Sequence, residues 1–127
     1  TTEIYTLSLH DALPIWVKTS VEFEPGGPGR LGAVITRGGY SDWSTQDFRV
    51  GQSAIELRVE LRGQDVLVEC RMPEASAPGG EPTRWLQLRL GHLPRARGEA
   101  VQAGLYACSP KGAGFTAEFE HLTIEPG

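Results

Sequence analysis

The stretch from Ile55 to Arg62 reads IELRVELR and alternates without interruption between apolar and charged residues. Successive side chains of a β-strand point to opposite faces of the sheet, so a period of two predicts one face in a core and the other in water. Ile55, Leu57, Val59 and Leu61 would be the buried set. The stretch therefore predicts a protein built from half-buried β-strands.

A second alternating stretch, from Trp16 to Phe23, predicts a strand with two different faces. One face carries Val17, Thr19, Val21 and Phe23, and the other carries Trp16, Lys18, Ser20 and Glu22.

The rest of the chain adds further short apolar runs separated by turn residues, and no segment keeps a helical period of 3.6. The 16 glycines and 9 prolines fit many short strands joined by turns. We therefore predict one domain of the all-β class, an antiparallel β-sandwich. The expected strands are Trp16–Phe23, Leu31–Arg37, Ile55–Arg62, Val66–Met72, the run Trp85–Leu90, Val101–Cys108 and Phe115–Ile124, with loops at Pro25–Gly29, Ser41–Ser44 and Pro73–Pro82.

Composition narrows the function classes. The formal net charge of −4 leaves no basic surface for nucleic acid, so no nucleic-acid partner is expected. No run approaches the ~20 apolar residues of a membrane-spanning helix, so no membrane partner is expected. Two cysteines, Cys70 and Cys108, make neither a disulfide framework nor a metal site, and no motif predicts a cofactor.

The first fifteen residues, Thr1–Ile15, read TTEIYTLSLHDALPI. They resemble the common short-read sequencing adapter translated in one frame, so we predict a non-native, adapter-derived segment that must be excluded from reasoning about function. On this prediction His10 and Asp11 are no catalytic pair. Without Glu3 and Asp11 the chain keeps 14 acidic and 12 basic residues, a net charge of −2.

The blocks after this segment resemble a known family. They are Trp16-Val17-Lys18-Thr19-Ser20-Val21-Glu22-Phe23, Ala33–Arg37, Ser41-Asp42-Trp43-Ser44, Leu57–Val59, Arg84–Leu90 and Gly104–Pro110. In combination they resemble the domain-of-unknown-function family that includes the fungal "regulation of enolase" protein.

This resemblance implies a concanavalin A-like, laminin-G-like jelly roll, and no catalytic residue is carried over with it. Family members have further strands before the Trp-Val-Lys block. Residues 16–127 are therefore expected to be the C-terminal portion of a single, N-terminally truncated jelly-roll domain. An open sandwich would result, with residues 1–15 loosely attached or borrowed as a surrogate strand.

The polar face of Trp16–Phe23 is the first candidate ligand site. Trp16, Lys18 and Glu22 would project together, with Arg37 joining from the next strand and Tyr106 from a later one. A sugar needs an aromatic plane for stacking and charged groups that bond its hydroxyls. The alternative is that Lys18 and Glu22 form an ordinary charge pair of the sheet, covered by Trp16.

Asp42 and Trp43 are the second candidates, because recognition residues often lie on loops. The alternative is that Asp42 caps a turn and Trp43 closes one end of the core.

Three functions stay open at this level. The leading interpretation is a non-catalytic module that binds a carbohydrate or a protein partner, the latter as a regulator of a metabolic enzyme. The second is a glycan-active enzyme with paired carboxylates on the concave sheet, for which no motif is present. The third is a structural accessory domain. The cytoplasm is slightly favoured as the compartment, and an upstream signal peptide stays open.

Overall fold

The computed structural model describes residues 2–9, 15–23, 26–48, 54–73, 79, 83–109 and 112–126, with the backbone alone for 2–9. Most of the expected loop Pro73–Pro82 lies outside these residues. Eight strands are formed within the described part, and they are β1 (Thr2–Leu9), β2 (Trp16–Phe23), β3 (Gly29–Arg37), β4 (Tyr40–Phe48), β5 (Glu56–Arg62), β6 (Asp65–Arg71), β7 (Leu86–His92) and β8 (Gln102–Cys108).

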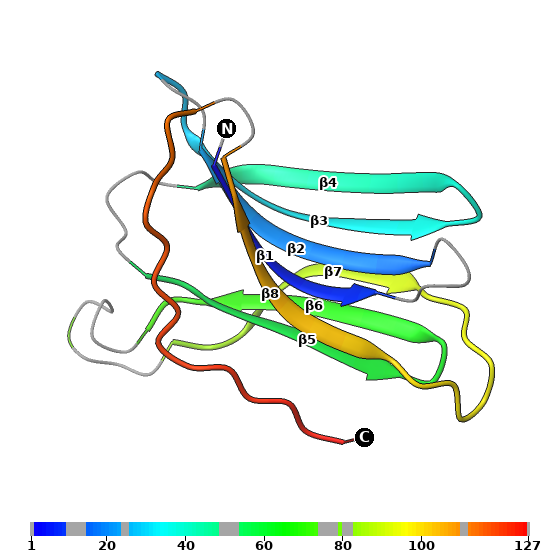
Figure 1. The fold of residues 1–127 in the computed structure, drawn as a ribbon. Helices are drawn as coiled ribbons and strands as arrows, with labels where there is room; N and C mark the ends of the chain where they lie inside the picture. The colour runs from blue at the N-terminus through cyan, green and yellow to red at the C-terminus, as the bar shows by residue number, and fades with distance from the viewer. Residues whose placement is uncertain are drawn as a thin grey trace.

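The strands make two antiparallel sheets that face each other, so the predicted all-β sandwich is confirmed (Figure 1). The larger sheet has the order β4-β3-β2-β1-β8, and the smaller has the order β5-β6-β7. No helix among the described residues could cross a membrane.

The core lies where β2 and β3 face β6. Val17, Ala33 and Ile35 of the larger sheet pack against Val66 and Val68 of the smaller one, with Leu93 beside them. Of the face of β2 that carries Val17, Thr19, Val21 and Phe23, the first three are buried and Phe23 is half-buried, while Ser20 of the other face is also buried. The buried hydroxyl of Thr19 is satisfied because it donates to the carbonyl oxygen of Gly32 at 2.9 Å.

The prediction of a loop at Ser41–Ser44 is wrong, because these residues lie inside β4. Gly38 and Gly39 have φ values of +55° and +83°. Positive φ at both central residues is typical of the two-residue type I′ turn, whose twist matches that of the flanking strands. Arg37 therefore pairs directly with Tyr40, and the ladder continues through Trp43 without a loop.

The predicted strand Phe115–Ile124 is also not observed. Residues 112–126 are described and contain no strand, although Phe115, Ala117 and Phe119 alternate as a strand requires. Alternation places apolar side chains on one side of an extended segment, but a β-strand also requires backbone hydrogen bonds to a neighbouring strand. Trp85, expected to open the strand Trp85–Leu90, instead lies just outside β7.

Residues Thr2–Leu9 form β1, which pairs with β2 on one side and with β8 on the other. This segment was expected to be either loosely attached or borrowed as a strand. The backbone of Thr2–Leu9 follows the second arrangement, because it is a strand within the larger sheet. The adapter origin of Thr1–Ile15 and the division of the chain at Trp16 stay predictions.

Candidate ligand-binding face

The outer face is the name used here for the side of the larger sheet turned away from β5, β6 and β7. Val17, Thr19 and Val21 are buried towards the smaller sheet, so the alternate residues of β2, Trp16, Lys18, Ser20 and Glu22, point to the outer face. Cross-strand partners share a face, and Lys18 pairs with Val34, which pairs with Trp43. The same register, carried through β1, brings Tyr106 to this face.

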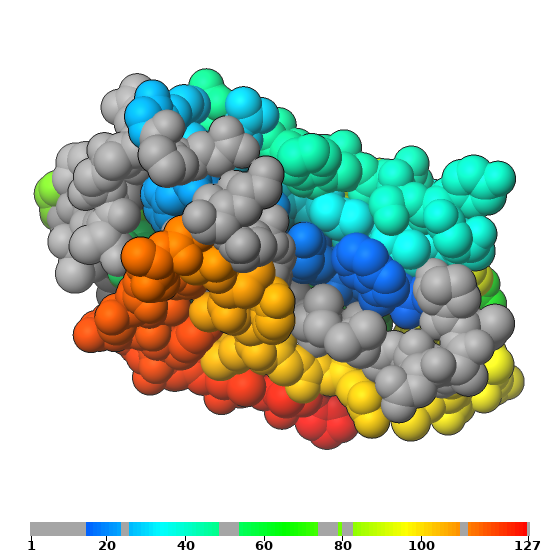
Figure 2. Space-filling model, turned by 45° about the horizontal axis from the view of Figure 1, so that its top comes forward, coloured from blue at the N-terminus to red at the C-terminus, as the bar shows by residue number. Residues whose placement is uncertain are grey.

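Five of the seven residues predicted to bind a ligand therefore lie on the outer face. Figure 2 shows this side of the molecule. In that view β2, in blue, lies between β3 and β4, in cyan, and β8, in orange. The five are Trp16, Lys18, Glu22, Trp43 and Tyr106.

Trp43 is the most exposed of the outer-face tryptophans, with 57% of its surface accessible. Its indole nitrogen lies 3.3 Å from the position that a Cβ atom on Gly32 would occupy. The indole therefore lies close over the backbone of β3 at Gly32, which has no side chain. An aromatic ring laid along a sheet and open to solvent is a surface on which an apolar ligand face can stack.

Small polar residues form the floor beside these rings. Ser20 and Thr36 point to the outer face and are nonetheless buried. Thr36 and Ser41 share a hydrogen bond of 2.7 Å between their hydroxyls, and Ser20 donates to Glu22 Oε1 at 3.3 Å. The floor therefore has its own hydrogen bonds, and one of them orients the Glu22 carboxylate.

Lys18 and Glu22 belong to different cross-strand rows of this face. They are four residues apart on one strand, which separates their backbones by about 13 Å. Lys18 lies in the row of Trp43, whereas Glu22 lies in the row of Arg30 and Asp47. The alternative considered from the sequence was a direct charge pair between Lys18 and Glu22. The register does not place them opposite each other, as a cross-strand pair requires.

Arg37 and Asp42 lie on the opposite side of the larger sheet, facing the smaller one. Arg37 Nη2 donates to Asp42 Oδ2 at 2.5 Å, and Arg37 Nη1 donates to the carbonyl oxygen of His92 at 3.2 Å. Arg89 of β7 approaches the same carboxylate oxygen at 3.9 Å. These two predicted ligand residues thus join the sheets at the rim of the sandwich, and the structure does not bring them to the outer face.

A hollow of about 150 Å³ opens on this inward side between β3, β4 and β7. No carboxylate, histidine or cysteine lines it. Its lining residues are Leu31, Gly32, Ala33, Ser44, Thr45, Gln46 and Leu88.

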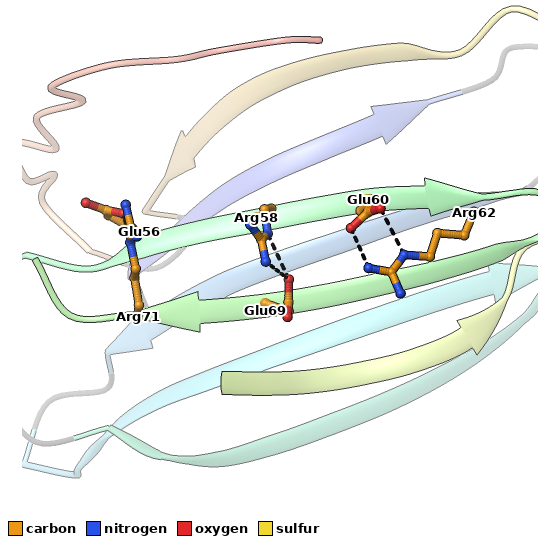
Figure 3. Close-up of polar contacts among 6 residues, drawn as sticks. All are labelled: Glu56, Arg58, Glu60, Arg62, Glu69 and Arg71. Atoms are coloured by element: carbon orange, nitrogen blue, oxygen red, sulfur yellow. Dashed lines mark hydrogen bonds and ion pairs between the residues drawn. The ribbon is translucent and has the colours of Figure 1, made fainter. Parts of the chain in front are cut away.

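The solvent face of the smaller sheet carries a row of paired arginine and glutamate side chains, called here the charged ladder (Figure 3). From the sequence, this face was predicted only to lie in water. Arg58 Nε donates to Glu69 Oε2 at 2.8 Å, and Arg71 pairs with Glu56. Trp85 lies against both arginines, with guanidinium carbons 4.2 Å and 4.5 Å from its ring centre. No sequence signal could reveal the contact of Trp85 with Arg58 and Arg71, because the three side chains come from separate segments that meet only in the folded sheet.

The pKa shifts at this ladder have local causes. The hydrogen bond from Arg62 lowers the pKa of the Glu60 carboxyl, and the same bond raises the pKa of Arg62. Burial raises the pKa of the Cys70 thiol, which keeps it protonated and unreactive. Neither Cys70 nor Cys108 forms a disulfide, and no metal-binding cluster of His, Cys, Asp or Glu occurs among the described residues.

We expect the Arg58–Glu69 pair to contribute little to stability. The Arg58 side chain is 42% exposed, so solvent reaches the pair although the Glu69 side chain is only 13% exposed, and ion pairs that solvent screens contribute about 0–1 kcal/mol. A double-mutant cycle with Arg58→Ala and Glu69→Ala, followed by urea unfolding, should give a coupling free energy within that range that falls as salt is added. A salt-independent coupling well above it would contradict this assignment.

Comparison with known proteins shows a family and a similar fold. The model of the family described as "Protein of unknown function (DUF1349)" matches residues 7–127. A search of curated proteins gives no match. Among solved structures, a functionally unknown protein from Saccharomyces cerevisiae is 22% identical with a TM-score of 0.58, over 86% of this chain and 59% of the yeast chain. The chain thus spans less than two thirds of that neighbour, and the likeness concerns the fold.

Proposed function

We propose that this chain, which belongs to the DUF1349 family of proteins of unknown function, is a non-catalytic module that binds a carbohydrate through the outer face of its larger sheet. The observation that carries the proposal is the exposed Trp43 indole over Gly32, in one row with Lys18. The fold proposed for the complete domain is the concanavalin A-like jelly roll.

The chemistry of the face suits a sugar better than a wholly apolar ligand. Trp16, Trp43 and Tyr106 supply aromatic surface for the CH face of a pyranose ring. Lys18 and Glu22 supply a charged donor and charged acceptors, whose hydrogen bonds are about twice as strong as neutral ones. Their separation of about 13 Å along β2 exceeds the width of one sugar ring, so an oligosaccharide is the better fit.

Replacement of Trp43 by alanine should weaken glycan binding about tenfold, which corresponds to about 1.4 kcal/mol of lost stacking. The measurement is a glycan array on the folded protein, followed by titration calorimetry of the strongest hit with wild type and Trp43→Ala.

Tyr40→Ala is the matched control for this experiment. Tyr40 is an 84% exposed aromatic residue of the same strand, but the register turns it to the opposite face. Its loss should leave the affinity unchanged. Equal losses in the two variants, or an array without any hit on a protein that circular dichroism shows to be folded, would refute the carbohydrate proposal.

A protein partner is the occupant to test next if the array is empty. The resemblance to the domain-of-unknown-function family that includes the fungal "regulation of enolase" protein supports a metabolic enzyme as that partner. Crosslinking with wild type and Trp43→Ala would then show whether the same face is used.

One observation favours the enzymatic alternative. Glu22 and Asp47 lie in one row of the outer face with Arg30 between them, so their strands are two spacings, about 10 Å, apart. That is close to the separation of the two carboxyl groups in inverting glycosidases. Release of reducing ends from a bound glycan, abolished by Glu22→Gln, would overturn the non-catalytic proposal.

A further inference from the structure

β4 is an outer strand of the larger sheet, at the end opposite to β8, and one of its edges is unpaired. Among the described strands it pairs only with β3. Figure 1 shows it at the top of the sheet with no labelled strand beyond it. The backbone hydrogen bonds that the described residues make outside the ladders are donated by Leu93 and Glu99 and do not involve β4. The backbone groups along this edge can therefore pair with another strand.

The free edge of β4 lacks the features that usually prevent pairing between molecules. Protected edge strands are short, are bent by a bulge, or carry proline or lysine. β4 has nine residues, and none of them is proline, lysine or arginine. Its register with β3 runs from Phe48 to Tyr40 without interruption. β4 is thus a long and regular edge that a further strand can extend.

The sequence of β4 is complementary to itself when two copies of the strand run antiparallel. If Ser44 lies opposite Ser44 of a second copy, each of the nine residues has a partner, and paired residues point to the same face of the sheet. Trp43 then lies opposite Thr45 of the second copy, and Tyr40 lies opposite Phe48. Pairs of an aromatic with a β-branched residue, and of two aromatics, are among those that stabilise antiparallel sheets.

The two carboxylates of β4 lie opposite hydrogen-bond donors in the same arrangement. Asp42 comes opposite Gln46 of the second copy, whose amide can donate to it, and Asp47 comes opposite the hydroxyl group of Ser41. No two like charges lie opposite each other. A ladder centred one residue to either side would leave one end of each strand without a partner in β4.

The aromatic side chains of this strand are exposed in the single chain. Tyr40 is 84% exposed and Trp43 is 57% exposed. In the paired arrangement the Trp43 residues of the two copies are diagonal neighbours, about 7–8 Å apart, which is within reach of aromatic side chains. Pairing therefore buries apolar surface as well as completing backbone hydrogen bonds.

We propose that two copies of this chain associate through β4, by antiparallel pairing of the two edges about Ser44. The dimer has a two-fold axis, so the same edge serves both copies, and the two larger sheets join into a single sheet with one continuous outer face. One nine-residue ladder is small beside the roughly 1,200–2,000 Å² of a stable interface, so the dimer forms at high protein concentration. The dimer does not depend on the carbohydrate proposal.

Sedimentation velocity of the folded chain measures this association. Between about 10 µM and about 1 mM protein, the weight-average sedimentation coefficient should rise from the monomer value towards the dimer value. It should not rise beyond that value, because a two-fold interface closes on itself.

Substitutions of opposite charge at Gln46 test the register. Gln46 is exposed, and in the dimer each copy places it opposite Asp42 of the other. Gln46→Glu should raise the dimer dissociation constant about fivefold, because like charges then face each other twice, and Gln46→Lys should lower it by a similar factor. Within one chain these residues are four positions apart on one strand, about 13 Å, so opposite effects of the two charges report a contact between copies.

Gln102 of β8 supplies the matched control. It is an exposed glutamine on the other outer strand of the same sheet. Gln102→Glu and Gln102→Lys make the same changes in net charge and should leave the dissociation constant unchanged. Circular dichroism of each variant checks that the sheets are intact.

Three results would overturn the proposal. The first is a chain that stays monomeric up to about 1 mM. The second is a dimer that responds in the same direction to both Gln46 variants, or equally to the Gln102 variants. The third is association that is abolished by Phe115→Asp/Phe119→Asp and unaffected at Gln46, since the copies then meet through the exposed apolar residues of 112–126 and not through β4.

Discussion

Replacement of Ile35 by alanine is expected to destabilise the protein by about 2–5 kcal/mol, the range for large-to-small changes in a packed core. Ile35 is 1% exposed and belongs to the cluster that joins the two sheets. Its removal leaves a cavity between β3 and the smaller sheet, where rigid strands on both sides limit collapse. Because domains are stable by only about 5–15 kcal/mol, the change should be plain in a urea or thermal unfolding curve.

Ile124→Ala is the matched control for this experiment. Ile124 has the same side chain but is 63% exposed in a segment without secondary structure, so its loss should change stability by less than about 0.5 kcal/mol. If the two variants lose similar stability, Ile35 does not occupy the core position described here.

The second large effect concerns the contact between Ile35 and Gly91 of β7. A Cβ atom on Gly91 would lie 2.1 Å from Ile35 Cδ1, far inside van der Waals contact. Gly91→Ala therefore overpacks the space between the sheets and should cost about 1–3 kcal/mol.

The Ile35→Val substitution removes the clashing methyl group and provides the test of this mechanism. Alone it should cost about 0.5–1.5 kcal/mol, as for other buried methyl deletions. In the double variant Ile35→Val/Gly91→Ala, the loss of unfolding free energy should be smaller than the sum of the two single losses. Gly104→Ala is the control, because no atom lies within 4 Å of its added Cβ. Additive losses would show that Gly91 is constrained by something other than Ile35.

The candidate site was only partly accessible to sequence reasoning. The alternation of Trp16–Phe23 correctly separated the outer-face residues of β2 from those that face the smaller sheet, since period two is a local property of an extended chain. Arg37 was assigned to the wrong face because the faces of two strands are related only through their register. That register pairs Arg37 with Tyr40, and the short Gly38–Gly39 turn sets it.

By itself, the sequence determined the all-β class, most strand positions and the core-facing side of β2 and β5, because these depend on neighbouring residues and on a fixed backbone geometry. Only the tertiary structure decided which strands are neighbours and which side chains meet. Trp43 lies over Gly32, and Trp85 lies against Arg58 and Arg71, through contacts between segments distant in sequence. The same dependence on a partner applies to Phe115–Phe119, whose alternation did not suffice to make a strand: a strand also needs ladder hydrogen bonds to a neighbouring strand, and residues 112–126 form none.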